Sequence, residues 1–218
     1  MRFLALSARL SSPGWTIRYN GGVGVREVRA MPAPLMSRDE VVERLFAVFR
    51  QRGYDGASLS ELSQATGLGR SSLYHYFPGG KEDMARAALD YLDSWVEGHL
   101  LAPLRGAGTP AERLARMTAE LDRLYDHGRS ACLLGALVHG EGRHLFQERL
   151  RSSFGALVAA LAALVVESGV APTEAQRRAE EAMVRIQGSL VLSGGLDDDG
   201  PFRRMLAGLE TLLLDAGR

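Results

Sequence analysis

The spacing of apolar residues constrains the fold of this chain more than any other feature. From about residue 37 to residue 214, apolar positions recur every three or four residues, and no segment alternates apolar and polar residues as a half-buried strand does. With 218 residues, 46% of them hydrophobic, the chain is long enough to bury a sizeable core. The sequence therefore predicts an all-α protein.

Short signals mark the helix boundaries in the first part of the chain. Ser37–Glu40 and Ser58–Glu61 have the capping-box pattern, in which two side chains satisfy free backbone N–H groups at a helix start. Gly53 and Gly67 are expected to end these two helices. A third short helix is expected over about 70–77, before the Pro-Gly-Gly turn at 78–80.

Longer helices are expected from Lys81 onward. The first of them is predicted to start at 81, and the others to cover about 110–127, 143–167, 173–192 and 201–214. A short apolar segment lies at 132–138. Thr109 before Pro110, and Thr173 with Gln176, are expected to cap two of them. The longest apolar run, 154–166, is shorter than the roughly 20 residues of a membrane span, so we interpret it as a buried helix.

Charge does not point to a partner. Lys+Arg and Asp+Glu both number 26, so a DNA-binding hypothesis must rest on where the cations lie. The single cysteine, Cys132, excludes an internal disulfide and is typical of a cytoplasmic protein. Its apolar neighbours favour packing over a redox switch. His127, His139 and His144 match no zinc signature, so we expect no metal and no cofactor.

Residues 1–36 lack periodicity and are rich in Pro and Gly, so we expect disorder there. Two interpretations stay open. The segment, with a charge of about +4, is either a basic arm that helps to hold DNA, or a leader that results from a start assigned too early. In the second case Met31 or Met36 is the true start.

Residues 59–78 have the pattern of a helix-turn-helix. Two short helices must cross closely, which needs small or apolar residues where they meet and a tight turn between them. Gly67 suits that turn because glycine adopts positive φ freely. The positions expected to face inward are Leu59, Leu62, Ala65, Leu68, Leu73 and Phe77.

The remaining positions of the second short helix are polar or aromatic and suit a major groove. We predict that the DNA-contacting residues there are Arg70, Ser71, Ser72, Tyr74, His75 and Tyr76. Ser58 and Lys81 stand at helix starts, where backbone N–H groups and the helix dipole favour a phosphate. These two residues are predicted to fix the register on DNA.

The string TGLGRSSLYHYFPGGKE at 66–82 closely resembles the DNA-binding domain of the TetR family of transcriptional regulators. Its Pro-Gly-Gly-Lys resembles the branch that contains the LmrA and YxaF regulators. The resemblance is strong over about 37–84 and weaker at 132–135 and 200–204. It implies a helix-turn-helix DNA-binding domain at 37–83 and a helical ligand-binding and dimerisation domain at 84–218.

The resemblance also implies a homodimer on double-stranded operator DNA, usually as a repressor that a small molecule releases. The last two helices would form the dimer interface. We predict Met183, Ile186, Leu190, Phe202, Met205 and Leu209 for it. Their spacing would equally serve a core within one chain.

Candidate residues for an effector pocket lie on the inner faces of the longer helices. They are Trp95, Met117, Leu121, Tyr125, Leu137, Phe146, Phe154, Met183 and Gln187. This set contains no cation, which favours a hydrophobic or aromatic effector. The same residues could simply form the core.

Other functions find little support. The chain has no phosphate-binding glycine loop, nucleophile elbow or zinc signature, so an enzyme is not expected. A DNA-binding regulator without a ligand is the alternative. The sequence leaves repressor versus activator open.

Overall fold

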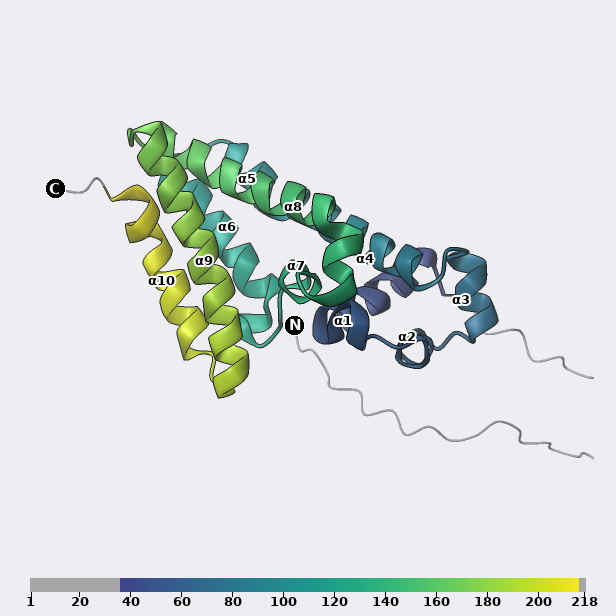
Figure 1. Ribbon diagram of the computed structural model, residues 1–218. Helices are drawn as coiled ribbons and strands as arrows, with labels where there is room; N and C mark the ends of the chain where they lie inside the picture. Colours follow the sequence, from purple (N-terminus) through teal and green to yellow (C-terminus); the bar gives the residue numbers. More distant parts are fainter. Residues whose placement is uncertain (1–35, 216–218) are drawn as a thin grey trace, which may run out of the picture. The chain divides into compact units, whose positions relative to one another are not determined.

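The computed structural model describes residues 36–215, and over this range it contains helices and turns but no strand, which confirms the all-α prediction (Figure 1). The segment 1–35, on which the expectation of disorder falls, lies outside the described residues. The helices are α1 (Arg38–Gly56), α2 (Leu59–Thr66), α3 (Arg70–Tyr76), α4 (Lys81–Val96), the π-helix η1 (Glu97–Leu101), α5 (Ala102–Arg105), α6 (Pro110–Leu124), the 3-10 turn η2 (Asp126–Gly128), α7 (Leu133–Leu137), α8 (Gly140–Glu167), α9 (Pro172–Leu196) and α10 (Gly200–Leu214).

Two predicted capping boxes are present at the starts of α1 and α2. The Ser37 hydroxyl accepts from the Glu40 amide at 3.2 Å, and the Glu40 carboxylate accepts from the Ser37 amide at 2.8 Å. Ser58 and Glu61 repeat this exchange at 3.2 and 3.0 Å. Thr109 caps α6, as expected from the proline that follows it.

The cap expected at Thr173 is wrong. Helix α9 begins at Pro172 with Ala171 at the cap position, and no side chain caps it. Proline takes the first helical position because its fixed φ suits the helix and its missing N–H is not needed there. Helices η1 and α5, which follow α4 along the chain, were not predicted from the sequence.

Helix α1 bends at Gly53 instead of ending there. Gly53 has φ 67° and ψ −174°, and the helix resumes as far as Gly56. A Cβ at position 53 would lie 2.9 Å from the carbonyl oxygen of Ala136. The bend therefore lets α1 approach α7, against which it packs.

The core joins helices that are distant in sequence. Helix α1 packs on α2, α4 and α7, and α9 lies between α8 and α10 (Figure 1). Phe49, Phe146 and Phe202 are among the largest fully buried side chains. The Tyr54 ring meets the Phe146 ring edge-on at 5.6 Å and so connects α1 to α8.

Helix α8 forms as predicted but is buried on one side only. It is long and apolar enough to span a membrane, with a mean hydropathy of 1.6 over its most apolar 18 residues, of which 28% are buried. Leu157, Leu161 and Leu164 are buried, and α8 packs on α9. Exposed and half-buried alanines and valines, among them Val166, contribute to the remaining hydropathy.

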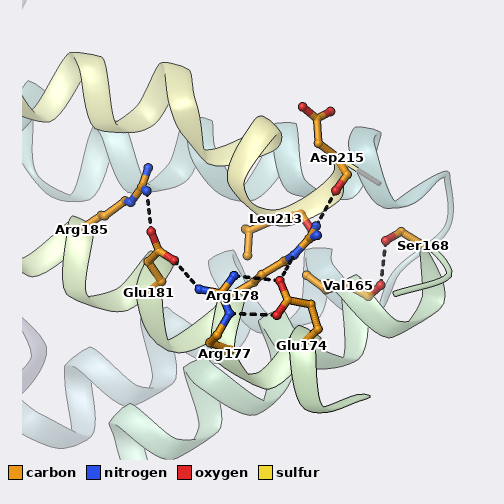
Figure 2. A network of polar contacts seen from close by, with 9 residues as sticks. All are labelled: Val165, Ser168, Glu174, Arg177, Arg178, Glu181, Arg185, Leu213 and Asp215. Carbon is orange, nitrogen blue, oxygen red and sulfur yellow. Dashed lines mark hydrogen bonds and ion pairs between the residues drawn. The ribbon is translucent and has the colours of Figure 1, made fainter. Parts of the chain in front are cut away.

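A network of arginines and glutamates connects α9 to the end of α10 (Figure 2). Arg178 pairs with Glu174 at 2.9 Å and donates to the carbonyl oxygens of Leu213 and Asp215 at 3.3 and 2.6 Å. Arg177 pairs with Glu174 and Glu181 on α9 alone. Hydrogen bonds from both arginines lower the pKa of Glu174 to about 2.

The two arginines should differ in their effect on stability. The Arg178 side chain is 12% exposed and binds free carbonyls at a helix end, so Arg178→Ala should lower the free energy of unfolding by about 1.5–3 kcal/mol. The Arg177 side chain is 61% exposed, and Arg177→Ala should change the free energy of unfolding little. Urea unfolding measures both variants. Equal effects would show that Arg178 does not hold α9 to α10.

Candidate nucleic-acid interface

Helices α2 and α3 form the predicted helix-turn-helix. Gly67 lies in the left-handed region at φ 69° and joins the two helices, as the sequence analysis expected. Leu62, Leu73 and Phe77 are buried, and they fix α2 and α3 to the core. The Arg44 guanidinium on α1 donates to the Ala65 carbonyl at the end of α2 at 3.3 Å.

The outward side of α3 is polar and free. We call its residues the recognition face: Arg70, Ser71, Ser72, Tyr74 and His75, all of them exposed. No side-chain hydrogen bond or ion pair within residues 36–215 engages Arg70, Ser71 or Ser72. Their donors are therefore available to an external partner.

Tyr74 is 45% exposed although its ring is large and mostly apolar. Gly80 brings the backbone close to this ring, since a Cβ at position 80 would lie 3.2 Å from Tyr74 Cε1. The ring therefore rests over the turn between α3 and α4, and within residues 36–215 its hydroxyl makes no hydrogen bond.

Three predicted contact residues are partly engaged within the chain. Tyr76 is half-buried, and its hydroxyl donates to the Met36 carbonyl at 3.3 Å. The Ser58 hydroxyl donates to the Glu61 carboxylate at 2.9 Å. The Lys81 ammonium lies 4.5 Å from the centre of the Tyr54 ring. These side chains are less free than the recognition face.

Carboxylates already occupy both helix starts beside α3. Hydrogen bonds from the amide and hydroxyl of Ser58 lower the pKa of Glu61, which keeps this carboxylate charged at the start of α2. At the start of α4, the Asp83 carboxylate accepts from the Gly79 amide at 2.6 Å. A phosphate at either helix start would have to share these donors with a carboxylate.

The predicted pocket residues only partly converge. Met117, Leu121, Tyr125, Met183 and Gln187 line one enclosed apolar cavity between α4, α6, α8 and α9. Its other lining residues were not predicted from the sequence to line a pocket: Leu92, Val96, Leu100, Leu124, Cys132, Leu134, Leu157 and Ile186. Helical spacing identifies an inner face but not which of its residues border a void.

The other four predicted pocket residues lie outside this cavity. Trp95 lines an open groove with Phe46, Tyr91 and His99, and it stacks on His99 at 4.6 Å. Leu137 and Phe146 are packed in the core, and Phe154 packs partly buried against it.

The cavity itself holds about 20 Å³, enough for about one water molecule. Burial raises the pKa of Tyr125, which lines it. Cys132 is buried there as well. Among the described residues, no group of His, Cys, Asp and Glu is arranged to hold a metal ion.

The predicted dimer residues lie mostly inside the chain. Met183, Ile186, Leu190, Phe202 and Leu209 are buried in its own core, and Met205 is half-buried, so these side chains do not form an outer surface. Packing of α9 against α8 and α10 accounts for their spacing, so the interface assignment stays a prediction, and burial within the protomer does not favour it. The exposed side of α9 instead carries Val184, Gly188, Val191, Leu192, Gly195 and Leu196, which we call the outer stripe.

Comparison with known proteins agrees with this geometry. Residues 42–88 match the family described as bacterial regulatory proteins, tetR family. The chain is 26% identical to the HTH-type transcriptional regulator YxaF of Bacillus subtilis over 161 residues, which cover 72% of this chain and 84% of that protein. The chain is also 32% identical to the HTH-type transcriptional repressor AcnR of Corynebacterium glutamicum over 100 residues, which cover 44% of this chain and 53% of that protein.

A solved structure shares the fold and contains DNA. The TetR family regulator CifR, a cysteine mutant complexed with 26-bp double-strand operator DNA, superposes with a TM-score of 0.67 at 25% identity. The match covers 85% of this chain and 100% of that one. Together with the helix-turn-helix at α2 and α3, these similarities identify the chain as a DNA-binding transcriptional regulator of the TetR family.

Proposed function

We propose that the chain is a cytoplasmic repressor that binds operator DNA as a homodimer and is released by a small apolar molecule. Residues 37–83 would form its DNA-binding domain and residues 84–218 its regulatory domain. The observation that carries the proposal is the recognition face, whose polar side chains are free while Leu73 and Phe77 hold α3 in the core.

Within the recognition face, the residues suit different tasks. Arg70 can bind guanine N7 and O6 with two hydrogen bonds, which gives it base selectivity. Ser71, Ser72 and His75 can bind bases or phosphates. Lys81 lies at the start of α4 and would contribute a positive charge near the backbone of DNA.

The outer stripe of α9 supports a homodimer. Val191 and Leu196 are 74% and 63% exposed, a large apolar exposure for one helix. A Cβ at Gly188 or Gly195 of this stripe, or at the half-buried Gly208 on α10, would meet no atom of the described chain within 4 Å. Each helical glycine costs about 0.8–1.0 kcal/mol relative to alanine, and nothing inside the protomer requires it. Close approach of a second copy of the chain would explain why these positions are glycines.

The arrangement of helices suits such a dimer. Figure 1 shows α2 and α3 at one end of the described chain and α10 at the other. Two copies that pair through α9 and α10 would each present one α3, which a two-fold operator requires. A single seven-residue helix reaches too few bases to specify a site.

Ligand release would work through the enclosed cavity. At about 20 Å³ it is almost filled, so a larger apolar molecule binds only a conformation in which α4, α6 and α9 have moved. Such a ligand shifts the population away from the DNA-binding conformation, and the size of the shift depends on how much more tightly it binds the other conformation. Titrating the protein–DNA complex with aromatic and apolar compounds tests this step. A compound that raises the Tm but leaves DNA binding unchanged would contradict it.

DNA binding should depend on α3. On a duplex selected by the wild-type protein from a random pool, Arg70→Ala and Tyr74→Ala should each lower affinity about tenfold or more, and Arg70→Ala should relax the preferred sequence. Lys81→Ala should weaken all duplexes similarly and reduce the salt slope by about one. Fluorescence anisotropy measures these effects.

Arg151→Ala is the matched control because Arg151 is an exposed arginine on α8. It should bind DNA like the wild type. The assignment of α3 fails if Arg70→Ala and Tyr74→Ala also retain full affinity while their circular dichroism is unchanged.

Oligomeric state should depend on the outer stripe. Val191→Glu places a charge in the proposed interface, so light scattering should give the protomer mass of 23.6 kDa instead of twice that value. Val166→Glu changes an exposed valine on α8 and should leave the dimer intact. A dimeric Val191→Glu protein would exclude this surface.

A further inference from the structure

A cleft of about 380 Å³ lies between α1, the 128–131 turn and α9. Its apolar side includes Phe46 and Leu190, and its polar side includes Arg50, Arg129 and Ser130. None of the residues that line it is Asp or Glu. The volume is that of a small-molecule site, and the lining combines an apolar surface with cations.

Arg50 is the unusual member of this lining. Its Nε donates to the Ala131 carbonyl, and its Nη2 donates to the Leu124 carbonyl at 2.6 Å. The guanidinium lies over two rings, 5.6 Å from the centre of Phe46 and 5.5 Å from that of Tyr125. Among residues 36–215, no carboxylate comes within 4.0 Å of it, and Nη1 has no hydrogen-bond acceptor.

Arg129 shares its ion-pair partner with a second arginine. This side chain pairs with Asp199 at 3.3 Å, but Arg203 pairs with the same carboxylate oxygen at 2.9 Å. The Asp199 carboxylate is therefore divided between two arginines. Within the described chain, no carboxylate forms an ion pair with Arg50.

The turn that carries Arg129 is held in an uncommon conformation. Asp126 and His127 have φ values of 46° and 57°, which cost energy in residues other than glycine. The turn is fixed from behind because the Tyr125 ring packs on Phe202 at 5.9 Å. Such preorganised segments occur at ligand clamps.

From this geometry we propose that the cleft binds a small organic anion, a carboxylate with a planar apolar body. The carboxylate lies at Arg50 and Arg129, and the body lies against Phe46 and Leu190. This site is separate from the enclosed cavity, whose lining contains no cation. Its occupant would contact both α1, which packs on α2 and α4, and α9, which carries the outer stripe. Binding of the anion itself does not require the repressor proposal.

The test uses the full chain without DNA, so its outcome is independent of operator binding. Isothermal titration should show 2-naphthoate binding with a sub-millimolar Kd, and the neutral 2-naphthamide at least tenfold weaker. Arg129→Gln should weaken 2-naphthoate at least tenfold and leave 2-naphthamide unchanged. This variant avoids Arg50, whose hydrogen bonds to two carbonyls make it important for folding.

A second variant tests the place of binding. A Cβ at Gly194, which lines the cleft, meets no atom within 4 Å, so Gly194→Leu should fold, fill the cleft and abolish 2-naphthoate binding. A Cβ at Gly155 on α8 likewise meets no atom within 4 Å, and Gly155→Leu should bind 2-naphthoate like the wild type. The proposal is overturned if wild type does not bind 2-naphthoate, if the acid and the amide bind equally, or if Arg129→Gln or Gly194→Leu binds like wild type.

Discussion

The placement of α3 depends on the burial of Leu73 and Phe77. A helix of seven residues is too short to be stable by itself in water, so tertiary contacts must hold it. Leu73 and Phe77 are 1% and 2% exposed, and they fix one side of α3 in a core made with α1, α2 and α4. Because that side is fixed, the other side must present Arg70 and Tyr74 to solvent. The proposed role of these residues in DNA recognition depends on this constraint.

Helix α1 extends the same core toward the C-terminal helices. It packs on α4 and α7, and the kink at Gly53 lets it approach Ala136. Arg50 on α1 donates to the carbonyl of Leu124, the last residue of α6, and to that of Ala131. A change in the position of α6 would therefore reach α1 through Arg50. This route gives a physical basis for the proposed control of α3 by a ligand, because both the enclosed cavity and the cleft proposed to bind an anion border residues of this region.

Local signals predicted the DNA-binding part well, and distant packing limited the rest. The caps at Ser37 and Ser58 and the left-handed Gly67 depend on neighbours within a few residues, so the sequence shows them directly. Which apolar residues of α9 face inward depends on where α8 and α10 lie. Helical spacing therefore placed Leu190 at an interface, whereas the structure buries it and exposes Val191. The position of Arg50 likewise depends on hydrogen bonds to Leu124 and Ala131, which lie 74 and 81 residues further along the chain.

Dimethyl sulfate protection on the selected duplex tests the central claim most directly, because it reports N7 of guanine in the major groove. Two copies of α3 on one face of DNA should protect two clusters of guanines whose centres are about 10–10.5 base pairs apart. Arg70→Ala should lose protection in both clusters. A single protected cluster, or a pattern that Arg70→Ala leaves unchanged, would contradict the account.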